Sequence, residues 1–164
     1  MQLIDRIDKA IIDLLAKDGR LSANEIARQI GDITPRIARY RLERLLANKT
    51  IHIAAVSIPQ EVGLNIIADI KVKVEAGKVL AVARQLAAYE QMTYVGCSIG
   101  DGDIGAQVVA SSLEEAYNFI TEVIGNIPGV RGTSTMIVPI VLKDAYMWII
   151  PQNLVSNEET TEPE

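Results

Sequence analysis

Two helix-start signals lie close together in the first third of this 164-residue chain. Ser22 and Glu25 form a capping box, in which the serine oxygen and the glutamate carboxylate each accept from the other residue's N–H group. Thr34 and Pro35 form the second signal, an N-cap followed by proline at the first helical position. The stretch between them, which contains Gly31, has room for one short helix and a turn. The sequence therefore predicts two short packed helices, the second of which begins after Thr34.

The second of these helices is amphipathic and basic. At 100° per residue, its packing side holds Ala38, Leu42 and Leu45. The opposite side carries four longer polar residues: Arg36, Arg39, Tyr40 and Arg44. Together with a helix predicted over residues 5–17, the two helices make a small three-helix unit. A basic helix that stands out from such a unit has the geometry of a DNA recognition helix, and a solvated charged face is the alternative interpretation.

Arg41 lies on the flank of this helix. Two roles are equally compatible with this position: contact with DNA, or an ion pair with an acidic side chain that braces the domain. The full predicted DNA interface comprises the start of the helix and its basic side chains: Thr34, Pro35, Arg36, Arg39, Tyr40, Arg41 and Arg44.

The charge of the chain is divided unevenly. The formal net charge is −5, yet residues 1–50 hold ten Lys and Arg against seven Asp and Glu, and residues 51–164 hold six against fourteen. Residues 34–50 hold five basic residues and one acidic residue. Because an electrostatic footprint is local, the acidic average does not exclude a nucleic-acid partner.

Single copies of Cys and His restrict the chemistry. Cys97 is the only cysteine, which rules out an internal disulfide, favours a small core residue over a reactive thiol, and suits a reducing cytoplasm. His52 is the only histidine, and without a Cys/His cluster we expect no metal and no cofactor. No stretch approaches the ~20 apolar residues of a membrane span, so we expect a cytoplasmic protein with no membrane partner.

The hydrophobic period changes after the first sixty residues. A strand with one polar face is predicted over residues 68–74, a helix over 78–86, strands over 93–99 and 104–110, a helix after the capping box at Ser112, and a strand over 133–142. This βαββαβ order gives a four-stranded antiparallel sheet with two helices on one face. We expect Val72, Val109 and Ile137 on the uncovered face, where a second copy of the chain would cover them.

The predicted fold class is α+β. Residues 1–53 form a winged helix-turn-helix domain, with Ile51–Ile53 as the wing position, and residues 54–63 form a linker. Residues 64–146 form a ferredoxin-like domain. Residues 147–164 form a C-terminal extension, whose end from residue 156 holds four glutamates and is expected to be disordered.

Residues 3–146 resemble the Lrp/AsnC family of transcription regulators. The resemblance rests on five pieces in order: residues 4–8, 18–22, 39–45, 100–103, and 127–130 running into 133–135. It implies a regulator rather than an enzyme, with a winged helix-turn-helix domain and a RAM/AsnC-type domain. It also implies homodimers that assemble to tetramers or octamers on double-stranded DNA.

The resemblance further implies an amino-acid effector bound between dimers. Its site would comprise a glycine-rich loop and the start of the last strand: Gly100, Asp101, Gly102, Asp103, Arg131, Gly132 and Thr133. There an aspartate would take the ammonium group and backbone N–H groups the carboxylate. Without the resemblance, an ordinary Asp/Gly hairpin turn is the favoured interpretation of the loop.

Three other functions compete with this one. A siroheme decarboxylase-like enzyme is disfavoured, since residues 51–164 are net acidic and the only histidine of the chain lies outside the predicted ferredoxin-like domain. A stand-alone amino-acid-sensing module is disfavoured by the basic first fifty residues. An effector-independent DNA-organising protein stays open.

Overall fold

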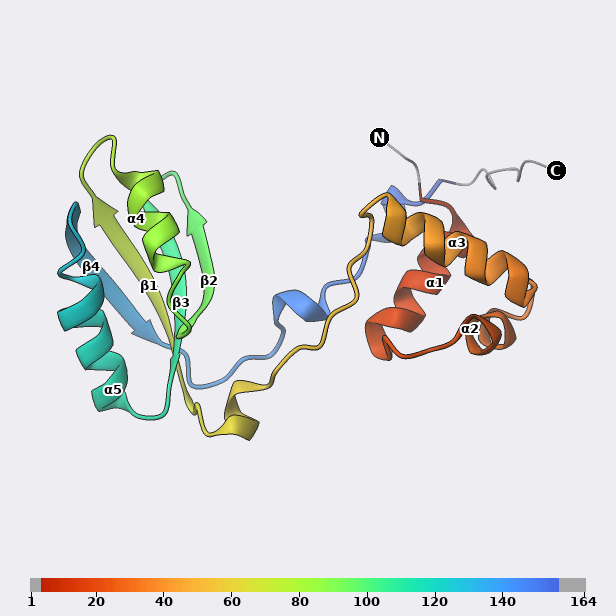
Figure 1. The fold of residues 1–164 in the computed structure, drawn as a ribbon, viewed down its shortest axis with the longest axis horizontal. Helices are drawn as coiled ribbons and strands as arrows, with labels where there is room; N and C mark the ends of the chain where they lie inside the picture. The colour runs from red at the N-terminus through yellow and green to blue at the C-terminus, as the bar shows by residue number, and fades with distance from the viewer. Residues whose placement is uncertain (1–3, 157–164) are drawn as a thin grey trace. The chain divides into compact units, whose positions relative to one another are not determined.

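The computed structural model describes residues 4–156, which form two compact units. Unit 1 contains the chain up to Val56 together with the residues from Lys143 onward, and unit 2 is Ser57–Leu142 (Figure 1). Residues 143–156 therefore belong with the N-terminal helices, whereas the sequence suggested a separate extension. The predicted acidic end, from residue 157 on, lies outside the described residues.

Unit 1 is built on three helices: α1 (Arg6–Lys17), α2 (Ala23–Ile30) and α3 (Pro35–Ala47). Asp5 caps α1 and Thr34 caps α3, each by accepting a backbone N–H with its side chain. The capping box predicted at Ser22 and Glu25 is present in both directions. These caps explain where each helix begins, and the predicted helical part of the domain is confirmed.

The core of unit 1 is apolar where the three helices meet. Ile11, Ile26 and Ala38 are fully buried, and Leu45 is nearly so. Burying each large aliphatic side chain contributes about 1.5–3 kcal/mol. This core fixes one side of α3 against α1 and α2 and leaves the opposite side exposed.

The predicted wing is not a strand. The chain leaves α3 through Lys49, whose φ of 57° lies in the left-handed region. Residues 51–58 then run without regular structure. The extended segment expected at Ile51–Ile53 finds no partner strand within the described part of the chain, so it does not form a β-wing there.

Unit 2 has the predicted βαββαβ order. Its elements are β1 (Ile66–Val74), α4 (Val79–Leu86), β2 (Met92–Cys97), β3 (Ile104–Ala110), α5 (Leu113–Asn118) with a π-helical continuation over Phe119–Ile124, and β4 (Val130–Ile137). The strands pair antiparallel in the order β2-β3-β1-β4. The fold class predicted from the sequence is confirmed.

The two faces of this sheet differ in what covers them. Val72 is fully buried, in the core that β1 forms with Leu86 of α4 and Ile124 after α5. Ile137 pairs with Ala68 and so shares that face, because directly paired residues point to the same side. Only Val109, paired with Ile67, lies on the opposite face, and there both side chains are already buried within the single chain, at 5% and 8% exposed. The prediction for Val72 and Ile137 is therefore wrong.

The last strand is displaced from the predicted position. It begins at Val130, directly after Gly129 turns the chain with a φ of 103°. It ends before Pro139, which has no N–H to donate to a sheet. The register shifts between Lys73 and Val74, so a β-bulge interrupts the pairing of β1 with β4.

Two further expectations concern exposure. Cys97 ends β2, an edge strand, and is exposed, so its interpretation as a core residue is wrong. None of the helices in residues 4–156 combines the length and apolar character needed to cross a membrane.

Candidate nucleic-acid interface and ligand site

The exposed side of α3 holds part of the predicted DNA interface. Arg36 and Arg39 are exposed, and Tyr40 is 43% exposed. Neither arginine has an ion-pair partner within residues 4–156. Thr34 and Pro35 are exposed at the start of the helix, where Thr34 Oγ1 accepts the Ile37 N–H at 3.2 Å. Two cationic groups of α3 are thus available to a partner.

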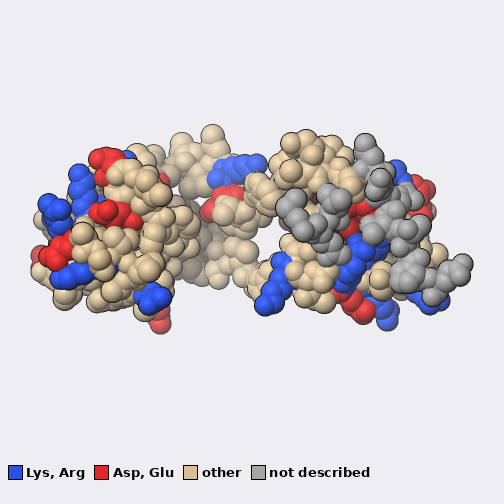
Figure 2. All heavy atoms as spheres, turned by 90° about the horizontal axis from the view of Figure 1, so that it is seen from above, with Lys and Arg blue, Asp and Glu red and all other residues tan. Residues whose placement is uncertain are grey.

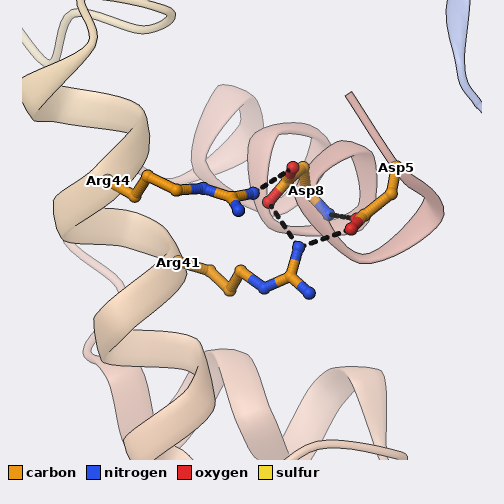
Figure 3. Close-up of polar contacts among 4 residues, drawn as sticks. All are labelled: Asp5, Asp8, Arg41 and Arg44. Atoms are coloured by element: carbon orange, nitrogen blue, oxygen red, sulfur yellow. Dashed lines mark hydrogen bonds and ion pairs between the residues drawn. The ribbon is translucent and has the colours of Figure 1, made fainter. Parts of the chain in front are cut away.

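Arg41 points the other way, into the unit (Figure 3). Its side chain is 3% exposed and pairs with the carboxylates of Asp5 and Asp8. Asp5 in turn accepts the Asp8 N–H at 2.9 Å, so the same carboxylate caps α1 and holds α3. Of the two roles left open for Arg41, the structure places it in the bracing one.

Arg44 also turns towards α1. Its Nη2 atom lies 2.6 Å from Asp8 Oδ2, and its side chain is 18% exposed (Figure 3). The prediction that Arg44 stands on the outer side of α3 is wrong, because an acidic partner on α1 draws the guanidinium across the helix interface. Asp5, Asp8, Arg41 and Arg44 are called the buried ion network below.

The charge state of the buried ion network is set by competing effects. Burial on its own would lower the pKa of Arg41, because a charge is less stable away from water. Hydrogen bonding and Coulomb attraction from Asp5 and Asp8 outweigh burial and raise the pKa above its ordinary value. Arg41 is therefore cationic throughout the physiological pH range.

Charge alone does not mark out the interface. On the face seen in Figure 2, Lys and Arg lie among Asp and Glu over both units. Lys49, exposed just after α3, was not included in the predicted interface. The count of basic residues over 34–50 was the sequence signal that could have included it.

The predicted effector loop lies at one end of the sheet in unit 2. The Asp103 N–H donates to Val72 O at 3.0 Å, and the Val74 N–H donates to Asp103 Oδ2 at 2.7 Å. Ser98 donates its N–H to Asp103 O at 2.9 Å and its hydroxyl to Gly102 O at 2.8 Å. Asp103 thus braces the end of β1.

Asp101, by contrast, is exposed. Its carboxylate lies 3.6 Å from Lys71 Nζ and 3.8 Å from Lys73 Nζ, and all three side chains are more than 60% exposed. The two lysines were missed as site residues. Their alternation with buried residues along the strand was the available signal, since it places both on the uncovered face beside the loop.

The second predicted wall of the site meets the same end of β1. Gly132 pairs with Lys73 and Thr133 pairs with Val72, while the loop lies along the other edge of β1. The two walls are therefore two strand spacings apart, about 10 Å. Since Val72 faces the helices, Thr133 lies on the covered face and Gly132 on the uncovered face. Arg131 lies in the bulge between Val130 and Gly132.

No metal site is formed by the part of the chain from residue 4 to 156: no three His, Cys, Asp or Glu side chains there are grouped to hold an ion. His52 is exposed in the irregular segment after α3.

A three-helix unit that exposes a basic third helix, joined to a βαββαβ unit, defines a helix-turn-helix DNA-binding protein with a second, regulatory-type domain. Two family descriptions match the same two parts. Residues 4–46 match the AsnC-type helix-turn-helix domain, and residues 67–147 match the Lrp/AsnC ligand binding domain. The chain belongs to the Lrp/AsnC family of HTH-type transcriptional regulators.

Relatives with curated names agree. An uncharacterised HTH-type transcriptional regulator of Pyrococcus furiosus is 37% identical over 145 residues, covering 88% of this chain and 97% of that protein. The regulator FL11 of the same organism is 38% identical over 137 residues, covering 83% and 89%. These relatives are regulators and not enzymes, which confirms the expectation for this chain.

Two solved structures show the same fold. A transcriptional regulator of Neisseria meningitidis in complex with L-methionine is similar with a TM-score of 0.83 at 21% identity, covering 92% of this chain and 97% of that one. AsnC of Escherichia coli is similar with a TM-score of 0.78 at 23% identity, covering 91% and 99%.

Proposed function

We propose that the chain reads specific duplex DNA with Arg36 and Arg39. The observation that carries this proposal is the division of the arginines of α3: Arg41 and Arg44 are held by aspartates, whereas Arg36 and Arg39 are exposed without an ion-pair partner in the described chain. Both lie in the first turns of the helix, the part that reaches base edges in helix-turn-helix proteins. An arginine gripping guanine with two hydrogen bonds contributes ~1–3 kcal/mol of discrimination.

Other groups on α3 or next to either of its ends would hold the DNA backbone. Tyr40 is placed to contact a phosphate or a thymine methyl, and Thr34 and Pro35 lie where the helix start approaches the duplex. Lys49 adds an exposed ammonium group. We assign Arg41 and Arg44 to bracing rather than to contact.

We further propose that unit 2 binds an amino acid and that its occupancy changes promoter occupancy. Lys71 and Lys73 would take the ligand carboxylate, and Asp101 the ammonium group. Gly100 and Gly102 would let the backbone approach the ligand. The family description of this unit as a ligand binding domain and the L-methionine complex of a similar fold support an amino acid.

The assembly proposed is a homodimer that associates further, with the uncovered sheet face buried between copies. Such a regulator acts in the cytoplasm, on promoter DNA.

The DNA assignment is tested with Arg36→Ala and Arg39→Ala in the full chain. Each should weaken binding to a duplex from the region upstream of the gene by about 5- to 150-fold, the equivalent of 1–3 kcal/mol. Fluorescence anisotropy at several salt concentrations measures this. If an arginine contacts a phosphate, the log-log salt slope also falls by about 0.9.

Arg84→Ala is the matched control, since Arg84 is an equally exposed arginine on α4 of unit 2. It should bind as the wild type does. If Arg36→Ala and Arg39→Ala bind no more weakly than Arg84→Ala, α3 does not read the DNA.

The effector assignment is tested by thermal-shift screening of the twenty amino acids. A ligand at a hundred times its dissociation constant stabilises by about 2.7 kcal/mol. Asp101→Asn should abolish the shift without lowering the unliganded midpoint. If no amino acid moves the midpoint, the proposal that unit 2 binds an amino acid is wrong.

A further inference from the structure

The last residues that the structure describes, up to Ser156, are part of unit 1. Residues 145–156, called the C-terminal strap here, contain two short 3-10 turns, Ala145–Met147 and Gln152–Leu154. Val155 forms a parallel β-bridge with Ile4, and the Ser156 N–H donates to Ile4 O at 2.8 Å. In Figure 1 the blue end of the ribbon accordingly returns to the helices of unit 1.

The strap is anchored by apolar contacts as well. Ile150 is only 9% exposed, whereas its neighbour Ile149 is 51% exposed. Tyr146 lines a hollow in unit 1 together with Leu15 of α1 and Ile53. A segment with one buried side chain flanked by exposed ones is attached at a specific point and does not merely lie along the surface.

Most of the strap lies outside the parts shared with the family descriptions. Those matches end at residue 147, so residues 148–156, which contain both Ile150 and the bridge to Ile4, belong to neither. The bridging interaction therefore calls for an explanation from this chain's own geometry.

The bridge is one residue away from the buried ion network. Ile4 is followed by Asp5, which caps α1 and pairs with Arg41 of α3. Asp8, one turn further along α1, pairs with both Arg41 and Arg44. A displacement of Ile4 thus acts directly on the carboxylate that fixes α3 against α1.

We propose that the C-terminal strap holds the recognition helix α3 in its DNA-reading orientation, through Ile4, Asp5 and Arg41. The proposal rests on the proposed function of α3. It makes Ile150 and Val155 positioning residues, which touch no DNA. Because the chain runs from β4 through residues 138–144 into the strap, the last strand of unit 2 is also covalently continuous with this support.

The test compares Ile150→Ala with Ile149→Ala in the full chain. The two variants make the same chemical change at neighbouring positions, one buried and one exposed. Affinity is measured for the upstream duplex and for a duplex of random sequence. Hydrogen exchange is followed at the Ser156 amide, which reports the strap, and at the Asp8 amide, which reports the cap of α1.

Ile150→Ala should bind the upstream duplex at least fivefold more weakly and bind the random duplex as before, since phosphate contacts tolerate a tilted helix better than base contacts do. Exchange should be faster at Ser156 and Asp8. Ile149→Ala should stay within twofold of wild type on every measure. If exchange at Ser156 is faster but both variants bind the upstream duplex equally, the strap does not position α3.

A cross-linked protein separates positioning from loss of folding. The protein carries Ile150→Ala together with a cysteine pair, Ile4→Cys and Val155→Cys. Bridged β residues lie within the Cα separation that a disulfide spans. Cys97→Ser removes the native thiol. Oxidation should restore binding of the upstream duplex to within twofold of wild type. If the oxidised and reduced forms bind equally poorly, the inference is wrong. If the wild type binds neither duplex, the proposed function fails instead.

Discussion

Replacing Arg41 by methionine removes a buried cation while keeping an unbranched side chain of similar length. Arg41 is 3% exposed and its partner Asp5 is fully buried, so water cannot take over the lost interaction. Asp8 retains its pair with Arg44. The cost therefore falls mainly on the carboxylate of Asp5, which stays buried beside an apolar methionine.

The size of this effect follows from that burial. Removing one partner of a buried ion pair costs about 3–5 kcal/mol, because it leaves a charge without its counter-charge. For a unit of this size each kcal/mol shifts the melting midpoint by about 4–8 °C, so the midpoint should fall by roughly 12 °C or more. By comparison, an exposed ion pair contributes at most about 1 kcal/mol to stability, so the larger effect at Arg41 is due to burial.

Urea unfolding followed by circular dichroism measures the free energy, and the fluorescence of Trp148 follows unit 1, to which this sole tryptophan belongs. Arg39→Met is the control: the same substitution at an exposed position of α3 should change stability by no more than about 0.5 kcal/mol and still weaken DNA binding. The reasoning is refuted if Arg41→Met retains wild-type stability and loses DNA affinity as Arg39→Met does.

Two further predictions concern pH and the loop of unit 2. The Ser22 hydroxyl and N–H hold the pKa of Glu25 below its ordinary value, so this carboxylate stabilises the fold above roughly pH 4.3 and less as pH falls through its folded-state pKa. Glu25→Gln should therefore lose less stability than wild type on acidification to about pH 3, as measured by thermal melts; an equal loss would contradict this. Asp103→Ala should destabilise unit 2 by ~1–3 kcal/mol, because the Val74 N–H loses its acceptor, whereas Asp103→Asn, which keeps an acceptor oxygen, should stay closer to wild type in urea unfolding.

Local signals in the sequence were sufficient for most of the fold. The N-caps at Ser22 and Thr34 are determined by a few neighbouring residues, and their two helices begin where those residues predict. The alternation along β1 likewise depends only on adjacent positions. Such features can be read without knowing what packs against them.

The orientation of Arg44 could not be predicted in the same way. Helical projection places it away from the packing side that holds Ala38, yet its direction is decided by Asp8 on another helix. The same long-range pairing resolved the two roles left open for Arg41. Charges far apart in sequence meet only once the tertiary fold is known.

The ligand-site prediction had a similar limit. A bulge beside Lys73 takes in Arg131 and turns Val130 to the covered face, whereas Gly132 and Thr133 keep the regular register of β4; neither outcome could be told from the strand pattern alone. The attachment of the strap also had no periodic signal, because a single buried Ile150 among exposed neighbours resembles any irregular segment.

The bridge between Ile4 and Val155 has a consequence for synthesis of the protein. A ribosome makes the helices of unit 1 before unit 2, and residues 145–156 after it. Under the proposed role of the strap, a nascent chain that has not reached Val155 carries an arginine-bearing α3 without this support. Translation through the strap is then a condition for the DNA-reading orientation of α3.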